Sequence, residues 1–314
     1  MWKAAIAAAV SVVALSVQAQ SYPDRPIRIV APAAGGGADV AVRLLSQPLS
    51  SGLGQPLIID NRGGNVVTTV SPVIKAAADG YTLLFYGSGL LLYPFMNPGS
   101  FDIFRDFTPI TLVDSSPSIL VVHPSLPVNS VRELVAMAKS KPGALNFAGG
   151  TAGAAPTMAA LLFNAMAGVD ITRINYKGTG QAINDVVAGR VQLMFASSAG
   201  APFVRSGKLR ILAVTSAKPS SLYPNVPTVA SAGYPGYEVD SYHAFFGPAG
   251  LPATVVNRIH TETLRALAQP EVKAKLFASG IEIAGVSPQE FAAQLKREAA
   301  IWGKIIKDAD IRDE

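Results

Sequence analysis

A glycine-rich turn near the start of the chain is the strongest local signal for ligand binding. It reads Ala33-Ala34-Gly35-Gly36-Gly37-Ala38-Asp39 and connects an expected strand to an expected helix. Glycines let backbone N–H groups approach a ligand closely, and a helix N-terminus carries partial positive charge. The turn therefore suits an anion, with Asp39 either capping the helix or ordering the loop. Val40 stands where a dinucleotide fingerprint needs its third glycine, and no P-loop motif is present. A plain tight turn is the alternative interpretation.

Loops of the same kind follow other expected strands. They are Gly87-Ser88-Gly89, the 149–153 loop with Gly150 and Thr151, and the 197–200 loop with Ser197 and Ser198. In open α/β sheets, ligands bind in the crevice beyond the carboxyl ends of the strands. Each loop alone is more often a simple turn, but together they predict a cleft that binds an anion.

Catalytic and metal-binding side chains are scarce. The sequence has no cysteine, which excludes disulfides, thiolate zinc sites, iron–sulfur clusters and a cysteine nucleophile. Of the three histidines, we expect His123 and His260 to be structural or solvated and His243 to pack at a hinge. There is no G-x-S-x-G elbow, and Ser88 has no assignable base. We therefore expect a protein that is not an enzyme and has no catalytic residue, cofactor or metal.

The formal charge of +5 is not concentrated in any basic run, because no three consecutive residues are Lys or Arg. Nucleic-acid binders more often show a basic stripe with interleaved aromatic residues, so we expect no nucleic-acid partner.

Residues 1–19 have the layout of a secretory signal peptide. Lys3 gives a positive start, an apolar run follows to Ser16, and Val17-Gln18-Ala19 suits cleavage after Ala19. A buried N-terminal helix is the alternative. Beyond residue 20, every apolar run is interrupted before the roughly 18 residues that a membrane span needs. We expect a periplasmic protein that does not itself span the membrane.

The rest of the sequence alternates short β-like runs with helical stretches, which predicts an α/β fold. A single core rarely exceeds roughly 250–300 residues, so the length of 314 favours two lobes. We expect each lobe to be a mainly parallel sheet flanked by helices. Chain crossings near Val122 and Tyr242 give a discontinuous lobe 1 of 20–122 plus 243–314 and a lobe 2 of 123–242. The expected strands are 27–31, 57–60, 82–86, 119–123, 145–148, 191–195, 209–215 and 238–246; the expected helices are 38–50, one ending near 78, one capped by Ser130, 156–167, 180–188, 199–206, 253–268, 271–279 and 288–308.

A series of short motifs then runs in order along nearly the whole mature chain. It comprises Tyr22-Pro23-Asp24-Arg25-Pro26-Ile27-Arg28-Ile29-Val30, the Gly-Gly-x-x-Asp turn ending at Asp39, Gly54-Gln55-Pro56, Asp60-Asn61-Arg62, Asp79-Gly80-Tyr81-Thr82-Leu83-Leu84, Tyr176-Lys177-Gly178, Gly207-Lys208-Leu209-Arg210, Pro224-Asn225-Val226-Pro227-Thr228 and Pro235-Gly236-Tyr237-Glu238. This combination closely resembles the Bug family, also called TctC type, the periplasmic solute-binding proteins of tripartite tricarboxylate transporters.

The resemblance implies a periplasmic-binding-protein type II-like fold, with a carboxylate held in a cleft between two lobes that close on it. It also implies an inner-membrane transporter with a large and a small subunit as the partner of a monomeric binding protein. Members of the family bind ligand carboxylates mainly through backbone amides, hydroxyls and ordered waters. That pattern carries over to the 36–39 turn, Ser88, the Gly150–Thr151 loop and the Ser197–Ser198 loop.

Two departures from the family pattern bear on the ligand. Many members carry an Asp after Met-Phe, and those that bind amino acids use an acid there, whereas this chain has Met194-Phe195-Ala196. A loop that often supplies hydroxyls reads Ala154-Ala155-Pro156 here. Several aromatic residues lie near the same loops: Phe85, Tyr86, Phe95, Phe195 and Phe203. We therefore expect an aromatic or otherwise apolar-bodied carboxylate, of which terephthalate is one example. The alternative interpretation, which the frequent burial of aromatic residues favours for each one singly, is that they are core.

Two other functions stay open at this point. A sensor module would present the bound carboxylate to a membrane signalling kinase, and a secreted hydrolase would need a nucleophile–base pair that the sequence does not reveal.

Overall fold

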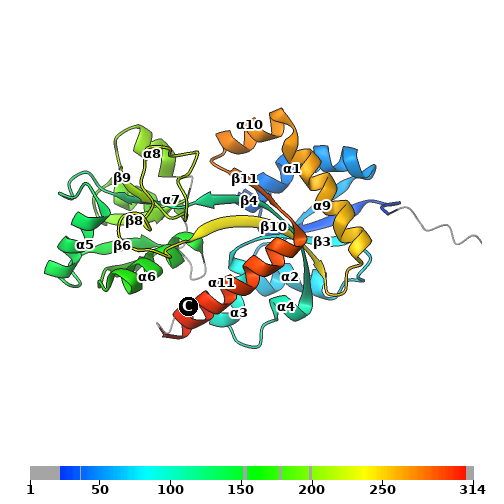
Figure 1. Cartoon of the computed structure of the whole chain (residues 1–314), viewed down its shortest axis with the longest axis horizontal. Coiled ribbons are helices and arrows are strands. Elements are labelled where there is room, and N and C mark those ends of the chain that lie inside the picture. The colour runs from blue at the N-terminus through cyan, green and yellow to red at the C-terminus, as the bar shows by residue number, and fades with distance from the viewer. Residues whose placement is uncertain (1–21, 36, 151–153, 177–178, 198–199, 309–314) are drawn as a thin grey trace, which may run out of the picture.

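The computed structural model describes residues 22–35, 37–150, 154–176, 179–197 and 200–308. It contains a six-stranded sheet and a five-stranded sheet, each with helices on both faces, and the two bodies lie side by side (Figure 1). The expected α/β fold with two lobes is thus confirmed at the level of its two sheets. None of the helices in the described ranges combines the length and apolar character needed to cross a bilayer.

The first sheet has the strand order β11-β4-β10-β3-β1-β2. Strands β1 (Ile27–Ala31), β2 (Leu57–Asn61) and β3 (Thr82–Gly87) are parallel, whereas β4 (Phe107–Pro117), β10 (Asp240–Pro248) and β11 (Glu282–Val286) join by antiparallel pairing. Alternate residues of β1 face opposite clusters, since Ile27 and Ile29 pack in one and Val30 in the other. This sheet is therefore buried on both faces.

Helices cover both faces of the first sheet. The cluster around Ile29 holds residues of α1 (Gly37–Leu53), α9 (Ala253–Ala268) and α10 (Pro270–Ala278). The cluster around Val30 holds residues of α2 (Val66–Ile74), α3 (Gly89–Met96), the short α4 (Ile103–Asp106) and α11 (Pro288–Asp308).

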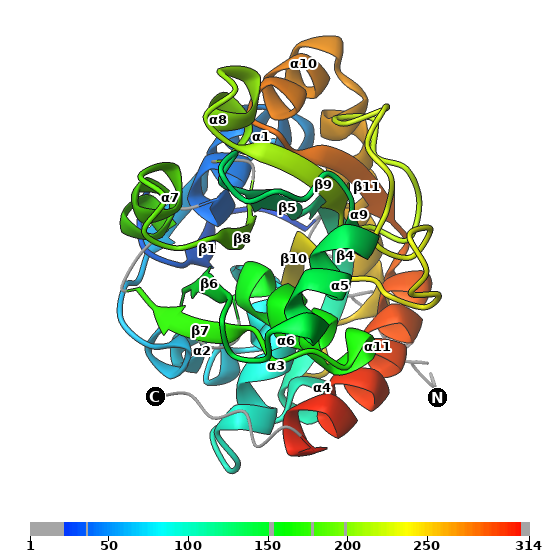
Figure 2. The same ribbon diagram turned by 90° about the vertical axis from the view of Figure 1, so that its left-hand side faces the viewer.

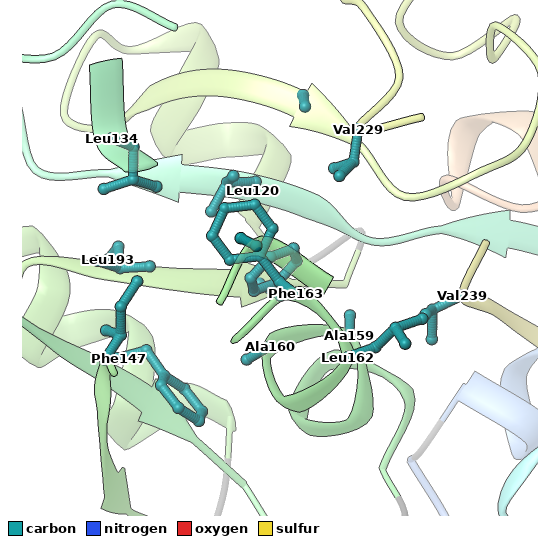
Figure 3. Packing of buried hydrophobic residues seen from close by; sticks show 14 of the residues in the cluster. Leu120, Leu134, Phe147, Ala159, Ala160, Leu162, Phe163, Leu193, Val229 and Val239 are labelled. Atoms are coloured by element: carbon teal, nitrogen blue, oxygen red, sulfur yellow. The ribbon is translucent and has the colours of Figure 1, made fainter. Parts of the chain in front are cut away.

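The second sheet has the order β7-β6-β8-β5-β9. Strands β6 (Asn146–Gly149), β7 (Thr172–Asn175) and β8 (Leu193–Ala196) are parallel, and β5 (Ile119–Val122) lies antiparallel between β8 and β9 (Arg210–Val214). Helices α5 (Val131–Ser140) and α6 (Ala155–Ala167) cover one face, and α7 (Thr179–Val187) and α8 (Ala201–Arg205) the other (Figure 2). Figure 3 shows part of the larger core cluster, where Leu162 and Phe163 of α6 and Leu120, Phe147 and Leu193 of the strands contribute side chains.

The structure corrects two expectations about the sheets. We expect residues 119–122 in lobe 1, but they form β5, which pairs with β8 and β9 of the second sheet, so the chain crosses at Ser118. We also expect mainly parallel sheets, yet both sheets are mixed. In the first sheet, β4 and β10 run antiparallel to each other along their whole length as the chain passes between the bodies (Figure 1). In the second sheet, β5 enters antiparallel to both β8 and β9.

The long C-terminal helix α11 contacts both bodies. Its N-terminal part packs against β4 and α3, with Phe291 fully buried in the first body. Near its other end, Trp302 is buried in the same cluster as Leu92 of α3 and Leu120 of β5. The helix therefore contributes side chains to both cores.

Candidate ligand-binding cleft

A cavity of about 790 Å³ lies between the two sheets. Loops at the ends of β1 and β3 line it from the first body, loops after β6 and β8 line it from the second, and the crossing strands supply further residues. The lining includes glycines, hydroxyl side chains, one phenyl ring and one imidazole: Gly35, Gly37, Ser88, Ser116, Ser118, Gly150, Thr157, Phe195, Ser197 and His243. Such a volume is typical of a small-molecule site.

The glycine-rich turn is held in shape by Asp39. Its buried carboxylate accepts the N–H of Gly35 at 2.9 Å, Nε of Arg43 at 2.8 Å and Nδ2 of Asn61 at 2.8 Å. Burial by itself opposes ionisation, but these three donors outweigh it and lower the pKa of Asp39. Gly35 has φ +82°, a left-handed conformation that favours glycine. Asp39 is thus an ionised anchor behind the turn.

Helix N-termini point at the cleft from both bodies. Gly37 begins α1, Ser88 is the N-cap of α3, and Ala154 is the N-cap of α6, and all three line the cavity. Neither Ser88 nor Ala154 caps its helix through a side chain. First-turn N–H groups therefore remain available, and their partial positive charge favours an anion.

Hydroxyl groups add donors on both sides of the cleft. Ser88 and Ser197 line it, and Thr157 Oγ1 accepts the N–H of Gly150 at 2.9 Å, which fixes the start of the loop after β6. Ser118 also lines the cavity, and its buried hydroxyl makes no hydrogen bond to a described residue. A buried hydroxyl without a partner is costly, so a ligand oxygen that accepts from it would remove that cost.

His243 of β10 also reaches the cleft. Its Nδ1 lies 2.9 and 3.1 Å from the two carboxylate oxygens of Asp114 on β4, and its ring stacks on Phe85 with centroids 5.9 Å apart. Asp114 is fully buried. His243 is therefore a fixed side chain of the cleft wall, in addition to the hinge packing that we expect from the sequence.

Among the described lining residues none is Lys, Arg, Asp or Glu, and in the described ranges no three His, Asp or Glu side chains are grouped so as to hold a metal ion. The cleft thus offers neutral donors, helix dipoles and one imidazole. Groups of this kind are chemically suited to a small anion.

A family model described as "Tripartite tricarboxylate transporter family receptor" matches residues 41–311. The chain belongs to the TctC family. Three solved structures are similar to it: R. palustris Rpa4515 with adipate, the periplasmic binding protein BugD, and MatC from Rhodopseudomonas palustris with bound malate. Their identities are 34%, 29% and 29%, and their TM-scores are 0.79, 0.77 and 0.75. The alignments cover 93%, 93% and 91% of this chain and 99%, 100% and 100% of theirs.

The family resemblance inferred from the motifs is thereby confirmed, and with it membership in a family of periplasmic solute-binding receptors. As in its relatives, the fold is of the periplasmic-binding-protein type II-like kind.

The expected site residues of this TctC family member fall into three groups. Gly35, Gly37, Ser88, Gly150, Phe195 and Ser197 line the cleft. Ala38 and Asp39 lie behind the lining, because Ala38 is buried in the apolar core and the Asp39 carboxylate points into its own turn. Gly36, Thr151 and Ser198 lie outside the described residues.

The sequence does not place the residues of the crossing strands in the site. Ser116, Ser241 and His243 line the cleft because β4 and β10 run past it, and Ser118 lines it from the position directly after β4. The one signal available was the polar run Ser115-Ser116-Pro117-Ser118 directly before a buried strand. Of the aromatic residues near the loops, Phe195 alone is in the lining, and it is almost wholly buried against Phe163.

Proposed function

We propose that this chain captures an organic carboxylate in the periplasm and delivers it to a tripartite tricarboxylate transporter. The observation that carries the proposal is the convergence of uncapped helix N-termini and hydroxyls, including the unpartnered Ser118, on one neutral cleft. A micromolar complex needs about 8 kcal/mol. Hydrogen bonds to a carboxylate contribute about 1.5–3 kcal/mol each, and the entropy cost of binding is subtracted from their sum, so the cleft must supply more than a few of them.

The titles of two similar structures support a carboxylate ligand, since one contains adipate and the other malate. The cleft has a small apolar wall at Ala154, Ala155 and Pro156, and it has no acidic lining residue in the described part of the chain to hold an ammonium group. We propose a mono- or dicarboxylate with an apolar body, and terephthalate is the aromatic example to test. An aliphatic dicarboxylate such as adipate has the same two ends without a ring.

The proposal includes export and closure. We propose that residues 1–19 are removed as a signal peptide, and that the two sheets act as lobes that close on the ligand in a monomer. The large and small membrane subunits of the transporter would then receive the closed form. Deleting the gene tests delivery: lost uptake of the carboxylate supports transport, whereas intact uptake with lost induction of its uptake genes would indicate a sensor.

Calorimetric titration of the purified protein with malate, citrate, adipate and terephthalate tests binding. Ser88→Ala and Ser197→Ala each remove one donor from the cleft, and we expect each to weaken binding about five- to tenfold, since a hydrogen bond contributes about 1 kcal/mol or more. Ser140→Ala, at the exposed end of α5, is the matched control and should leave the affinity unchanged. If no carboxylate in the panel binds, the proposed function is wrong.

A further inference from the structure

His243 is the one side chain among the described lining residues that can gain a positive charge near neutral pH. The other lining side chains are apolar or carry hydroxyls, and several lining residues are glycines. The side chain of His243 is 15% exposed, so part of the ring reaches the cavity. Any full side-chain charge that the described lining presents to an anionic ligand therefore depends on this imidazole, beside the partial charges of the helix N-termini.

Asp114 fixes which ring nitrogen carries a proton. The Asp114 carboxylate accepts the backbone N–H of His243 at Oδ1 at 3.1 Å, and the tautomer that suits this partner has its proton on Nδ1, which then donates to the same carboxylate. In the neutral imidazole, Nε2 is then an acceptor, and in the cation Nε2 becomes a donor. Nε2 makes no hydrogen bond to a described residue.

The Nε2 edge of the ring faces the helix start that lines the cleft. A Cβ atom placed on Gly37 would lie 3.3 Å from Cε1 and 3.4 Å from Nε2 of His243. The imidazole and the N-terminus of α1 thus adjoin the same corner of the cavity. Both favour negative charge when the ring is protonated, because a helix N-terminus carries partial positive charge.

Few titratable groups surround the ring on the neighbouring elements, and Asp114 is the one that contacts it. The others are Tyr86 on β3, Asp39 on α1, Glu282 on β11 and Asp240 on β10 itself. Tyr86 stays neutral, since burial raises its pKa to about 12. Asp39 is bound by Gly35, Arg43 and Asn61, and Glu282 accepts hydrogen bonds from Ser220 and Ser221.

We propose that His243, oriented by Asp114, binds a carboxylate of the ligand through a protonated Nε2, so that ligand binding is coupled to uptake of one proton. This rests on the proposed carboxylate-binding function. A carboxylate oxygen beside a neutral Nε2 would place two acceptors in contact, whereas the anion stabilises the imidazolium. The proton comes from solvent, is bound at Nε2, and leaves when the ligand is released.

The test is calorimetric titration with adipate and with malate from pH 6 to 8.5, at each pH in two zwitterionic or cationic buffers that both hold that pH. These buffers differ in ionisation enthalpy, so the difference in measured heat gives the number of protons taken up. We expect proton uptake to approach one per ligand as the pH rises. The Kd should increase about tenfold per pH unit once the imidazole of the free protein is neutral.

Variants separate this role from a structural one. His243→Gln should still fold, bind more weakly by tenfold or more at pH 6, and lose both the proton uptake and the pH dependence of Kd. Asp114→Asn should shift the uptake profile to lower pH, because the imidazolium loses its partner carboxylate. His260→Gln, whose ring Nδ1 contacts Thr111 rather than the cleft, is the matched control and should behave as wild type.

The outcomes are distinguishable. If neither adipate nor malate binds to wild type, the proposed carboxylate-binding function loses its support for these ligands, and the panel with citrate and terephthalate decides it. If either binds but with constant Kd and no proton uptake from pH 6 to 8.5, or if His243→Gln keeps the wild-type profile, the role of His243 is refuted while carboxylate binding stands.

Discussion

Replacement of Asp39 by alanine tests whether the glycine-rich turn depends on its buried anchor. The substitution removes an acceptor used by the N–H of Gly35 and by the side chains of Arg43 and Asn61. Each hydrogen bond to a charged group contributes about 1.5–3 kcal/mol, but Arg43 is half exposed and recovers hydration. Asn61 keeps its bond to the carbonyl of Pro32. We expect a loss of about 2–4 kcal/mol in the free energy of unfolding.

The same change should weaken ligand binding, because the N-terminus of α1 is no longer held in place. We expect at least a fivefold higher Kd for the carboxylate that binds best in the panel. Asp39→Asn keeps one acceptor oxygen and should lose about half as much stability.

The pH dependence of stability follows from the lowered pKa of Asp39. Its folded-state pKa lies below the unfolded value, so the stabilisation is present above the unfolded value and is lost as pH falls through the folded one. The difference in the free energy of unfolding between wild type and Asp39→Asn should therefore become smaller as the pH falls into the acid range.

Urea unfolding followed by circular dichroism, together with calorimetric titration, measures both effects. Asp102→Ala is the control, because Asp102 caps the exposed α4 by accepting the N–H groups of Phe104 at 2.8 Å and Arg105 at 3.1 Å. Asp102→Ala should lower the free energy of unfolding by about 1 kcal/mol and leave the carboxylate affinity unchanged. An Asp39→Ala variant with a stability loss below that of Asp102→Ala, or with wild-type affinity, would refute the role of Asp39 as an anchor.

Three further changes probe other parts of the molecule. Burial raises the pKa of Asp240 to about 7, so the folded state binds the proton more tightly than the unfolded state. The free energy of unfolding should therefore fall by about 4 kcal/mol as pH rises from about 4 to 7, and Asp240→Asn should flatten this slope in urea titrations. Thr157→Val leaves the N–H of Gly150 without its acceptor. It should lower the free energy of unfolding by about 1–2 kcal/mol and weaken carboxylate binding severalfold. Unchanged affinity would contradict the view that this hydrogen bond shapes the cleft. Gly52→Ala places a Cβ against Oε2 of the buried Glu262 and should lower the free energy of unfolding by about 2–4 kcal/mol in thermal unfolding, with carboxylate affinity unchanged. A variant as stable as wild type would show that Glu262 moves freely.

Local patterns were sufficient to predict many elements. The strand at 27–31 and the helices at 253–268 and 288–308 match the structure, because apolar periodicity and caps act within a few residues. The capping box of Ser287 and Glu290 is present, with Ser287 Oγ donating to Glu290 Oε2 at 2.6 Å. The strand β4 was not predicted, since Pro109 and the Asp114-Ser115-Ser116 run break the apolar alternation.

The features that could not be predicted from the sequence depend on pairing between strands that are far apart in the chain. From the sequence, β5 is predicted to be the last strand of the first lobe. Its hydrogen bonds to β8 and β9 place it in the second sheet. Likewise, His243 and Asp114 are 129 residues apart, and only the antiparallel register of β10 on β4 brings them together. Loops that follow strands were predictable because the carboxyl ends of parallel strands share one edge, whereas groups on the crossing strands depend on tertiary register.

The burial of Trp302 between the two cores has a practical consequence. The sequence holds two tryptophans, and Trp2 lies in the segment that we propose is removed on export. The exported protein would then carry a single indole, buried in a cluster that includes Leu92 of the first body and Leu120 of the second. A shift of one body against the other changes the polarity around that ring. The tryptophan fluorescence spectrum of the unlabelled protein should therefore report closure, and stopped-flow fluorescence can follow it during ligand binding and release.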